Sequence, residues 1–304
     1  MAFAAFGSSA TPTEHAPRRK SPVAIILLLP GLAYLALFFL TPLVSLVLTS
    51  LQAPVEFGDV GQYQAAVKIE NYAAVIGAYW PHFLRAFGYA IAATFFALVI
   101  SYPLAYFIGV KARPWPLLQA LMLTLVIAPF FISFLLRTLA WKQLMSDDSG
   151  IVSLLKALTI LPADGHLTGT AFSVIFGLTY NFIPFMTLPI YTTLERLDTR
   201  YLEAGSDLYA SPVSTFWRVT IPLSLPGIVS GTLLTFIPAS GDYINASASF
   251  LGSAQTQMVG NVIETQFISL LNYPQASALS VLLMGLILLI VGIYVKRSGT
   301  EDLL

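Results

Sequence analysis

The sequence predicts an all-α polytopic membrane protein, and three observations support this fold class. Of the 304 residues, 57% are hydrophobic and only 10% are charged, with a mean hydropathy of +0.78. Soluble chains carry about 25% charged residues. Six stretches are long and apolar enough to cross a lipid bilayer as helices, which takes about 20 residues each. Lysine and arginine gather in alternate loops between these stretches.

The six predicted transmembrane helices cover roughly 23–50, 84–110, 116–140, 169–193, 217–240 and 276–295. The first is preceded by Arg18, Arg19 and Lys20, as a signal peptide would be. However, its apolar run is about twice the length of a signal sequence core and lacks a small-x-small cleavage site. We therefore expect a retained helix. The predicted organisation is an N-terminal cytoplasmic tail without fixed structure (1–21), one membrane domain (22–297) and a cytoplasmic C-terminal tail (298–304).

Basic residues predict the orientation, because cytoplasmic loops carry an excess of lysine and arginine. They precede the first span, lie between the second and third and between the fourth and fifth, and follow the sixth: Arg18, Arg19, Lys20, Lys111, Arg113, Arg196, Arg200, Arg218, Lys296 and Arg297. Both termini are therefore predicted to be cytoplasmic. Longer loops at about 51–83, 141–168 and 241–275 are expected on the outer face.

Several function classes lack the residues that they need. The absence of cysteine excludes disulfides, thiol catalysis and cysteine-ligated metals. His15, His82 and His166 are not spaced as helical metal ligands. No G-x-x-x-x-G-K phosphate loop occurs, so the chain does not hydrolyse nucleotide by that route. A net charge of zero provides no basic surface for nucleic acid. No cofactor or metal is expected on this chain.

The most informative segment is the polar, helix-forming stretch 201–228 between the fourth and fifth spans. Asp198 is suited to cap a helix that starts one residue later, and Ser211-Pro212 is expected to end it. Glu203 and Asp207 form an acidic ridge at i, i+4. The other face is apolar and contains Tyr201, Ala204, Gly205, Leu208 and Pro212. This pattern suits docking into a basic groove of a partner protein, and it also fits an ordinary solvated connecting helix.

The segment resembles the cytoplasmic loop motif of ABC-importer permeases, which reads E-A-A, three residues, G, nine residues, I-x-L-P. The corresponding and flanking positions here are Glu203, Ala204, Gly205, Asp207, Leu208, Tyr209, Ala210 and Pro222. Two positions depart from the motif. Gly205 replaces an alanine, and Tyr209 replaces the glycine that in this family allows a sharp turn between two short helices. The backbone at Tyr209 must therefore form this turn in another way. The resemblance implies coupling helices that fit a cleft of a cytoplasmic ATPase, which would bind the ATP and Mg.

Most of the chain, roughly 25–295, is similar to one branch of these permeases, that of the spermidine/putrescine importers. Matching pieces include Asn71-Tyr72, Tyr102–Tyr106, Leu136–Trp141, Tyr180–Phe185 and Gly260–Ile263. The resemblance implies a multi-pass protein of the bacterial inner membrane. Its implied partners are a second permease subunit in a heterodimer, two copies of the ATPase, and an extracytoplasmic substrate-binding protein. Related branches carry opines, aminophosphonates, thiamine or ferric iron, and these cargoes remain alternatives to a polyamine.

Four residues are candidates for the substrate pathway. Asp242 follows the fifth span, where a carboxylate beside broken helix backbone suits an ammonium group. Tyr243 offers an aromatic face to the same cation. Tyr180 and Asn181 precede Pro184 in the fourth span, where a kink can open a cavity. A solvated helix end is the alternative for the first pair, and ordinary interhelical hydrogen bonding is the alternative for the second.

Arg137 and Glu264 are candidates for contact with the binding protein. Arg137 lies about twenty residues into the third span, and a side chain that reaches for the membrane interface beside Trp141 is the alternative. Glu264 lies on a predicted amphipathic helix near 259–271. Its apolar residues recur at helical spacing: Val259, Val262, Ile263, Phe267 and Leu270. A short interfacial helix that covers the bundle would show the same pattern.

Two other classes of protein fit the sequence less well. An ion-coupled secondary transporter would show two similar halves and coupling carboxylates near mid-membrane. Spans one to three do not visibly repeat in spans four to six, and no span carries a central Asp or Glu. A membrane-embedded enzyme would need clustered histidines, a Ser-His pair or paired carboxylates within the bilayer, and the spans contain none of these.

Overall fold

The computed structural model describes residues 22–298, which form two units divided between Ser45 and Leu46. The first unit holds α1 (Pro22–Leu35), the π-helical turn η1 (Ala36–Leu40) and the start of α2 (Thr41–Ser50). The stretch Leu27–Ser50 is long and apolar enough to cross a membrane, so the first predicted span is confirmed as a helix. The two predicted tails, 1–21 and all but the first residue of 298–304, lie outside the described residues.

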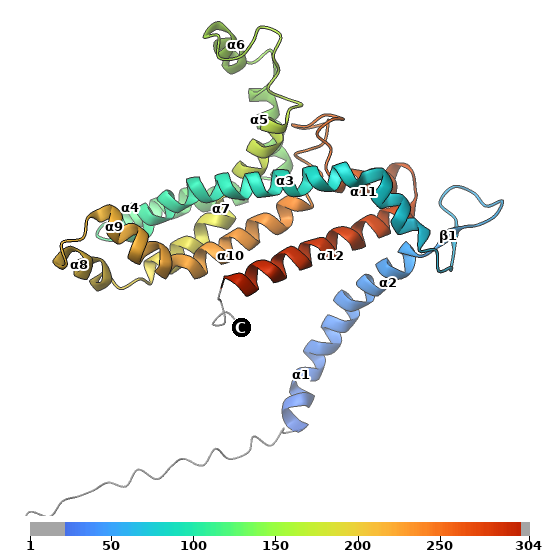
Figure 1. Cartoon of the computed structure of the whole chain (residues 1–304), viewed down its shortest axis with the longest axis horizontal. Helices are drawn as coiled ribbons and strands as arrows, with labels where there is room; N and C mark the ends of the chain where they lie inside the picture. The colour runs from blue at the N-terminus through green and yellow to red at the C-terminus, as the bar shows by residue number, and fades with distance from the viewer. Residues whose placement is uncertain (1–21, 299–304) are drawn as a thin grey trace, which may run out of the picture. The chain divides into compact units, whose positions relative to one another are not determined.

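The second unit is built on four long helices. α7 packs against both α3 and α10, and α12 packs against α3 (Figure 1). One face of α3 carries small side chains at helical spacing (Ala86, Ala90, Ala93 and Ala97), and all of them are fully buried. Small residues let helix backbones approach closely within a membrane. The long helices are α3 (Glu70–Tyr106, continued by the π-helical turn η2, Phe107–Lys111), α7 (Ala171–Glu195), α10 (Ile221–Ser240) and α12 (Tyr273–Arg297).

Two glycines set the contact between α7 and α10. Gly227 and Gly231 lie four residues apart on α10 and both face α7. A Cβ atom on Gly227 would lie 2.7 Å from the carbonyl oxygen of Pro189, and one on Gly231 would lie 2.9 Å from that of Met186. Only glycine allows so close an approach of two helix backbones. This is a G-x-x-x-G packing pattern.

The third predicted span is not one continuous helix. α4 (Pro116–Ile127) continues into a 3-10 turn, η3 (Ala128–Phe131), and α5 (Phe134–Leu144) then leaves at an angle of 95°. Pro129 lacks a backbone donor, and both Ile132 and Ser133 have ψ angles typical of extended backbone. The described part of the chain therefore has five helices that can span a membrane, and six if the bent pair counts as one.

The segments between the long helices contain shorter elements. α6 (Gly150–Ala157) is capped by Ser149, and α11 (Val259–Glu264) continues into the π-helical turn η5 (Thr265–Ser269). The predicted amphipathic helix near 259–271 is thus confirmed, with Val259 and Val262 buried. The all-α prediction needs one correction. Two short antiparallel strands, β1 (Ala53–Pro54) and β2 (Tyr63–Gln64), pair in the loop before α3.

Candidate functional site

The segment with the ABC-permease motif forms two short helices at one end of the bundle, and α11 lies at the other end (Figure 1). These helices are α8 (Arg200–Asp207) and α9 (Pro212–Thr215). α9 runs through the π-helical turn η4 (Phe216–Thr220) directly into α10. A displacement of α9 therefore moves α10 with it.

The two short helices pack closely and are tied to the end of α7. A Cβ atom on Gly205 would lie 2.8 Å from Oγ1 of Thr215, which shows how close α8 and α9 lie. Just before α8, the guanidinium group of Arg113 donates to the carbonyl oxygens of Leu194 and Leu197, both at 3.1 Å. An arginine at this position satisfies the free carbonyl groups at the C-terminus of α7.

The turn after α8 shows how a tyrosine replaces the glycine of the motif. Tyr209 has a φ angle of +55°, in the left-handed region that glycine adopts most easily. The amide of Ala210 donates to the carbonyl of Gly205 at 3.0 Å, which is the helix-closing bond of a Schellman motif. The Tyr209 side chain is 99% exposed, so it does not compensate the backbone strain by packing against the described part of the chain.

The predicted ends of the motif helix are half right. The carboxylate of Asp198 accepts a hydrogen bond from the amide of Arg200 at 3.0 Å, so the predicted N-terminal cap is confirmed. Ser211-Pro212, however, does not end this helix, because α8 already stops at Asp207. Ser211 instead caps α9 by accepting from the amide of Ser214 at 3.2 Å, and Pro212 occupies the first helical position.

The exposed face of this loop combines acidic and apolar residues. Glu203 and Asp207 are exposed on α8, next to exposed Ala204 and Leu208. Pro222, at the start of α10, is also exposed. An apolar surface of this kind beside a carboxylate ridge is typical of a site that a partner covers.

Replacing Tyr209 with glycine is expected to rigidify the α8–α9 turn. The left-handed conformation costs a residue with a side chain about 1 kcal/mol more than glycine. Hydrogen exchange of the backbone amides at 203–210 should therefore slow in Tyr209→Gly. The control is Tyr201→Gly, an exposed position inside α8, where glycine weakens the helix by about 1 kcal/mol and should speed exchange. Faster exchange in both variants would contradict the strain at Tyr209.

A buried hydrogen-bond network lies near the C-terminus of α10, and Asn245 is at its centre. The side-chain oxygen of Asn245 accepts from the amide nitrogen of Asn181 at 3.2 Å and from the hydroxyl of Thr138 at 3.5 Å. Its own amide nitrogen donates to Asp242 at 3.0 Å, and its backbone amide donates to the same carboxylate at 2.7 Å. The network joins α5, α7 and the turn after α10.

This network brings together two of the four predicted pathway residues, Asn181 and Asp242. Both are buried, with 1% and 7% of their surface exposed. Sequence reasoning missed Thr138 and Asn245. Asn245 could have been found from its place three residues after Asp242, because the side chain of an aspartate in a tight turn often accepts a hydrogen bond from a backbone amide a few residues later. In this conformation the carboxylate of Asp242 holds the turn together instead of facing open space.

Burial raises the pKa of Asp242 to about 6, although its hydrogen bonds to Asn245 act in the opposite direction. In the unfolded chain the carboxyl has its usual pKa near 3.8. The ionised carboxylate therefore destabilises the fold by about 3 kcal/mol above pH 6, and this penalty fades as the pH falls toward 4.

The wild type is consequently expected to gain stability relative to Asp242→Asn as the pH falls from about 7 to about 4.5. Asparagine does not titrate, so residue 242 adds no pH dependence to the stability of the variant. The other titrating groups are the same in both proteins, so the pH dependence of the difference in their free energies of unfolding reports the titration of Asp242 alone. Thermal unfolding of both proteins across the pH range measures it. A difference that does not change with pH would show that Asp242 is not buried as an ionisable group.

The remaining predicted residues lie elsewhere. The Tyr180 ring packs edge-on against Trp141 at 5.2 Å, and it lines a separate hollow of about 270 Å³ near Pro184. Arg137 is buried on α5, with its guanidinium group 5.7 Å from the centre of the Phe134 ring. Its Nε and Nη1 atoms have no hydrogen-bond partner among the described residues. A direct contact with another protein would require Arg137 to become exposed.

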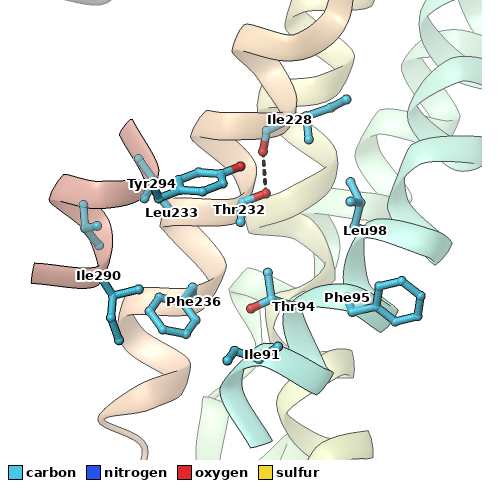
Figure 2. Close-up of a pocket in the computed structure, with 11 residues that line it drawn as sticks. Ile91, Thr94, Phe95, Leu98, Ile228, Thr232, Leu233, Phe236, Ile290 and Tyr294 are labelled. Carbon is cyan, nitrogen blue, oxygen red and sulfur yellow. Dashed lines mark hydrogen bonds between the residues drawn. The ribbon is translucent and has the colours of Figure 1, made fainter. Parts of the chain in front are cut away.

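Two further hollows differ in their chemistry. One hollow, of about 290 Å³, lies beside α11 and is lined by both Tyr243 and Glu264. The other, of about 380 Å³, lies between α3, α10 and α12 (Figure 2). Its lining is apolar apart from Thr94, Thr232 and Tyr294, and Thr232 already donates to the carbonyl of Ile228 at 2.7 Å. A hollow without a charged side chain does not suit a charged solute.

The fold matches those of solved ABC importers. The chain superimposes on a bacterial ABC transporter that imports the acidic polysaccharide alginate with a TM-score of 0.64, over 92% of this chain and 96% of that chain, at 13% identity. The inward-facing MetNI methionine ABC transporter gives a TM-score of 0.57, over 74% of this chain and 96% of that chain, at 20% identity. The fold is therefore that of an ABC-importer permease.

Proteins of similar sequence show which family of ABC-importer permeases the chain resembles. The spermidine/putrescine transport system permease protein PotB of Haemophilus influenzae is 34% identical over 237 residues, which cover 78% of this chain and 81% of the relative. PotB of Salmonella typhimurium strain LT2 is 36% identical over 239 residues, covering 76% and 80%. No family model matches the chain.

The chain belongs to the family of the spermidine/putrescine transport system permease proteins. It is a transmembrane permease subunit of an ABC importer, a transport subunit and not an enzyme, in the bacterial inner membrane.

Proposed function

We propose that this permease carries polyamines of the spermidine and putrescine type into the cell. The observation that carries the proposal is the alignment with relatives named for spermidine/putrescine transport, at 34–36% identity over about three quarters of the chain. In this proposal the chain forms half of the translocation pathway in a heterodimer with a second permease subunit. An extracytoplasmic binding protein delivers the substrate.

The segment 200–215, which comprises α8, the turn after it and α9 and is here called the α8–α9 loop, is proposed as the contact with a cytoplasmic ABC ATPase, two copies of which bind and hydrolyse ATP with Mg. Three features support this role. Glu203, Asp207 and Leu208 are exposed, Arg113 fixes the entry to the loop, and α9 continues into α10 without a break. A stiff, exposed element joined directly to a membrane helix is what the transmission of a rigid-body motion requires. This chain itself needs no cofactor for this role.

The proposed topology has six membrane spans, with the bent α4–α5 pair as the third and both termini in the cytoplasm. Arg196 precedes α8, Arg200 is its first residue and Arg218 lies in η4, and these basic residues favour a cytoplasmic position for the α8–α9 loop. α11 lies at the opposite end of the bundle from α8 and α9 (Figure 1). Glu264 is the last residue of α11, and the backbone of Asp242 and Tyr243 contacts α11 through Gly260 and Asn261. This end is then the outer one, where substrate enters from the binding protein.

The choice of cargo is tested on the complete importer. The chain is reconstituted in lipid vesicles with its second permease subunit, ATPase and binding protein, and ATP hydrolysis is measured with a panel of solutes. Spermidine and putrescine are expected to stimulate hydrolysis, whereas an opine, an aminophosphonate, thiamine and ferric iron are not. Stimulation by one of the other solutes, without stimulation by either polyamine, would overturn the polyamine assignment.

A further inference from the structure

A hollow of about 290 Å³, here called the Glu264 hollow, lies between the turn after α10 and the α11–η5 segment. Gly241 and Tyr243 line it from the turn. The α11–η5 segment supplies the rest of its wall: Gly260, Ile263, Glu264, Phe267 and Ile268. Two residues that sequence reasoning assigned to different roles, Tyr243 and Glu264, thus face the same space.

The walls of the Glu264 hollow are held in place by hydrogen bonds and close packing. The side chain of Asn261 donates to the carbonyl oxygen of Tyr243 at 2.6 Å and accepts from the amide of Met258 at 3.0 Å. A Cβ atom on Gly260 would lie 2.7 Å from the carbonyl oxygens of both Gly241 and Asp242, so the turn rests directly on the backbone of α11. The hollow is therefore preformed, which reduces the free energy needed to order a binding site.

The lining of this hollow combines one carboxylate with aromatic and aliphatic walls. Glu264 is half-buried, and its carboxylate has no hydrogen-bond or ion-pair partner among the described residues. Tyr243 and Phe267 are 47% and 53% exposed, so their rings remain available to a ligand. A carboxylate pairs with an ammonium group, aromatic rings attract the same cation, and Ile263 and Ile268 suit the methylene groups between amines.

The backbone at Glu264 also departs from a regular helix. The π-helical turn η5 begins at the next residue, and the amide of Leu270 donates to the carbonyl of Thr265 at 3.0 Å. The described part of the chain has three other π-helical turns, η1, η2 and η4, and in each of them the wider turn changes the register of the side chains that follow it. Here the shifted segment carries Phe267 and Ile268 into the lining.

We propose that the Glu264 hollow binds one protonated amine of an alkyl polyamine on the permease itself. Glu264 pairs with the ammonium group, and Tyr243 and Phe267 flank it. The hollow takes the amine after its release from the binding protein, at the outer end of the bundle. This inference rests on the proposed polyamine function and adds to it a substrate site with named residues.

The test uses the complete importer in lipid vesicles, with spermidine uptake measured against spermidine and binding-protein concentrations. Glu264→Gln keeps the shape of the side chain and removes its charge, and we expect uptake at low spermidine to fall about three- to tenfold. The binding-protein concentration for half-maximal uptake should stay the same. Glu264→Asp should recover at least part of the loss, and Phe267→Leu should reduce uptake by about threefold. Glu70→Gln, an exposed carboxylate at the start of α3, is the control and should match the wild type.

Three results would overturn the proposal in distinguishable ways. If Glu264→Gln transports spermidine as well as the wild type does, the hollow is not a substrate site, although the importer still carries polyamines. If this variant needs more binding protein but reaches the same maximal rate, Glu264 contacts the binding protein. If the wild-type importer takes up no spermidine, the proposed function fails and the assignment of the hollow fails with it.

Discussion

Replacing Glu203 with arginine is expected to abolish coupled transport while the chain still inserts into the membrane. Glu203 lies exposed on α8, on the acidic ridge of the α8–α9 loop. In the proposed complex this ridge faces basic groups of the ATPase. Reversal of its charge replaces an attraction by a repulsion, which should weaken ATPase binding by about 2 kcal/mol or more, roughly 30-fold. Within residues 22–298, the Glu203 side chain has no hydrogen bond or ion pair to the long helices, so insertion should not change.

This prediction is checked by co-purification of the ATPase with the permease and by spermidine-stimulated ATP hydrolysis in vesicles. The matched control is Glu56→Arg, which makes the same change at an exposed carboxylate in the loop before α3. The control should bind the ATPase and transport as the wild type does. Undiminished transport by Glu203→Arg would exclude the α8–α9 loop as the coupling element.

Replacing Gly231 with leucine is expected to separate α7 from α10 and to destabilise the permease strongly. A Cβ atom at this position would already lie 2.9 Å from the Met186 carbonyl oxygen and from its sulfur atom. The backbones must therefore move apart, and overpacking of this kind costs about 3 kcal/mol or more. Because α10 is continuous with α9, the same displacement should also impair transport.

Thermal unfolding of the purified importer in detergent measures this effect. Gly285→Leu is the matched control, because an added Cβ at Gly285 on α12 would meet no atom within 4 Å in the described part of the chain, apart from the backbone of its own helix and its two neighbours in sequence. Leucine there should be tolerated and should slightly favour the helix. Equal melting temperatures for the two variants would show that the G-x-x-x-G contact of α7 and α10 does not determine stability.

Local composition was sufficient to predict most of the membrane helices. The apolar runs that became α7, α10 and α12 are long enough to span a bilayer, and a span must satisfy its own backbone hydrogen bonds. The same rule misjudged residues 116–140, because an apolar run of this length has the same composition whether it is straight or bent. Pro129 marked the break, but prolines within α7 and α10 leave those helices continuous. Whether a proline breaks a helix depends on the packing around it.

The candidate sites also divide into features that local sequence predicts and features that depend on tertiary packing. The α8–α9 loop could be recognised from the spacing of Glu203, Ala204 and Pro222, because caps and turns act over a few residues. The left-handed conformation of Tyr209 completes the turn at the position where the motif carries glycine. The Asn181–Asn245–Asp242 network could not be predicted, since it joins residues from α7 and from the turn after α10.

The sequence by itself determined that this chain is a polytopic membrane protein with a capped, polar helical loop between two of its spans, because hydropathy, charge and capping are local properties. The tertiary structure alone decided which polar residues are buried within the chain and which line an open hollow. It buries Asp242, which looked accessible at the end of a span, and it leaves Glu264 open beside Tyr243 and Phe267. The physical reason is that desolvation depends on every element that packs around a side chain, and those elements come from distant parts of the chain.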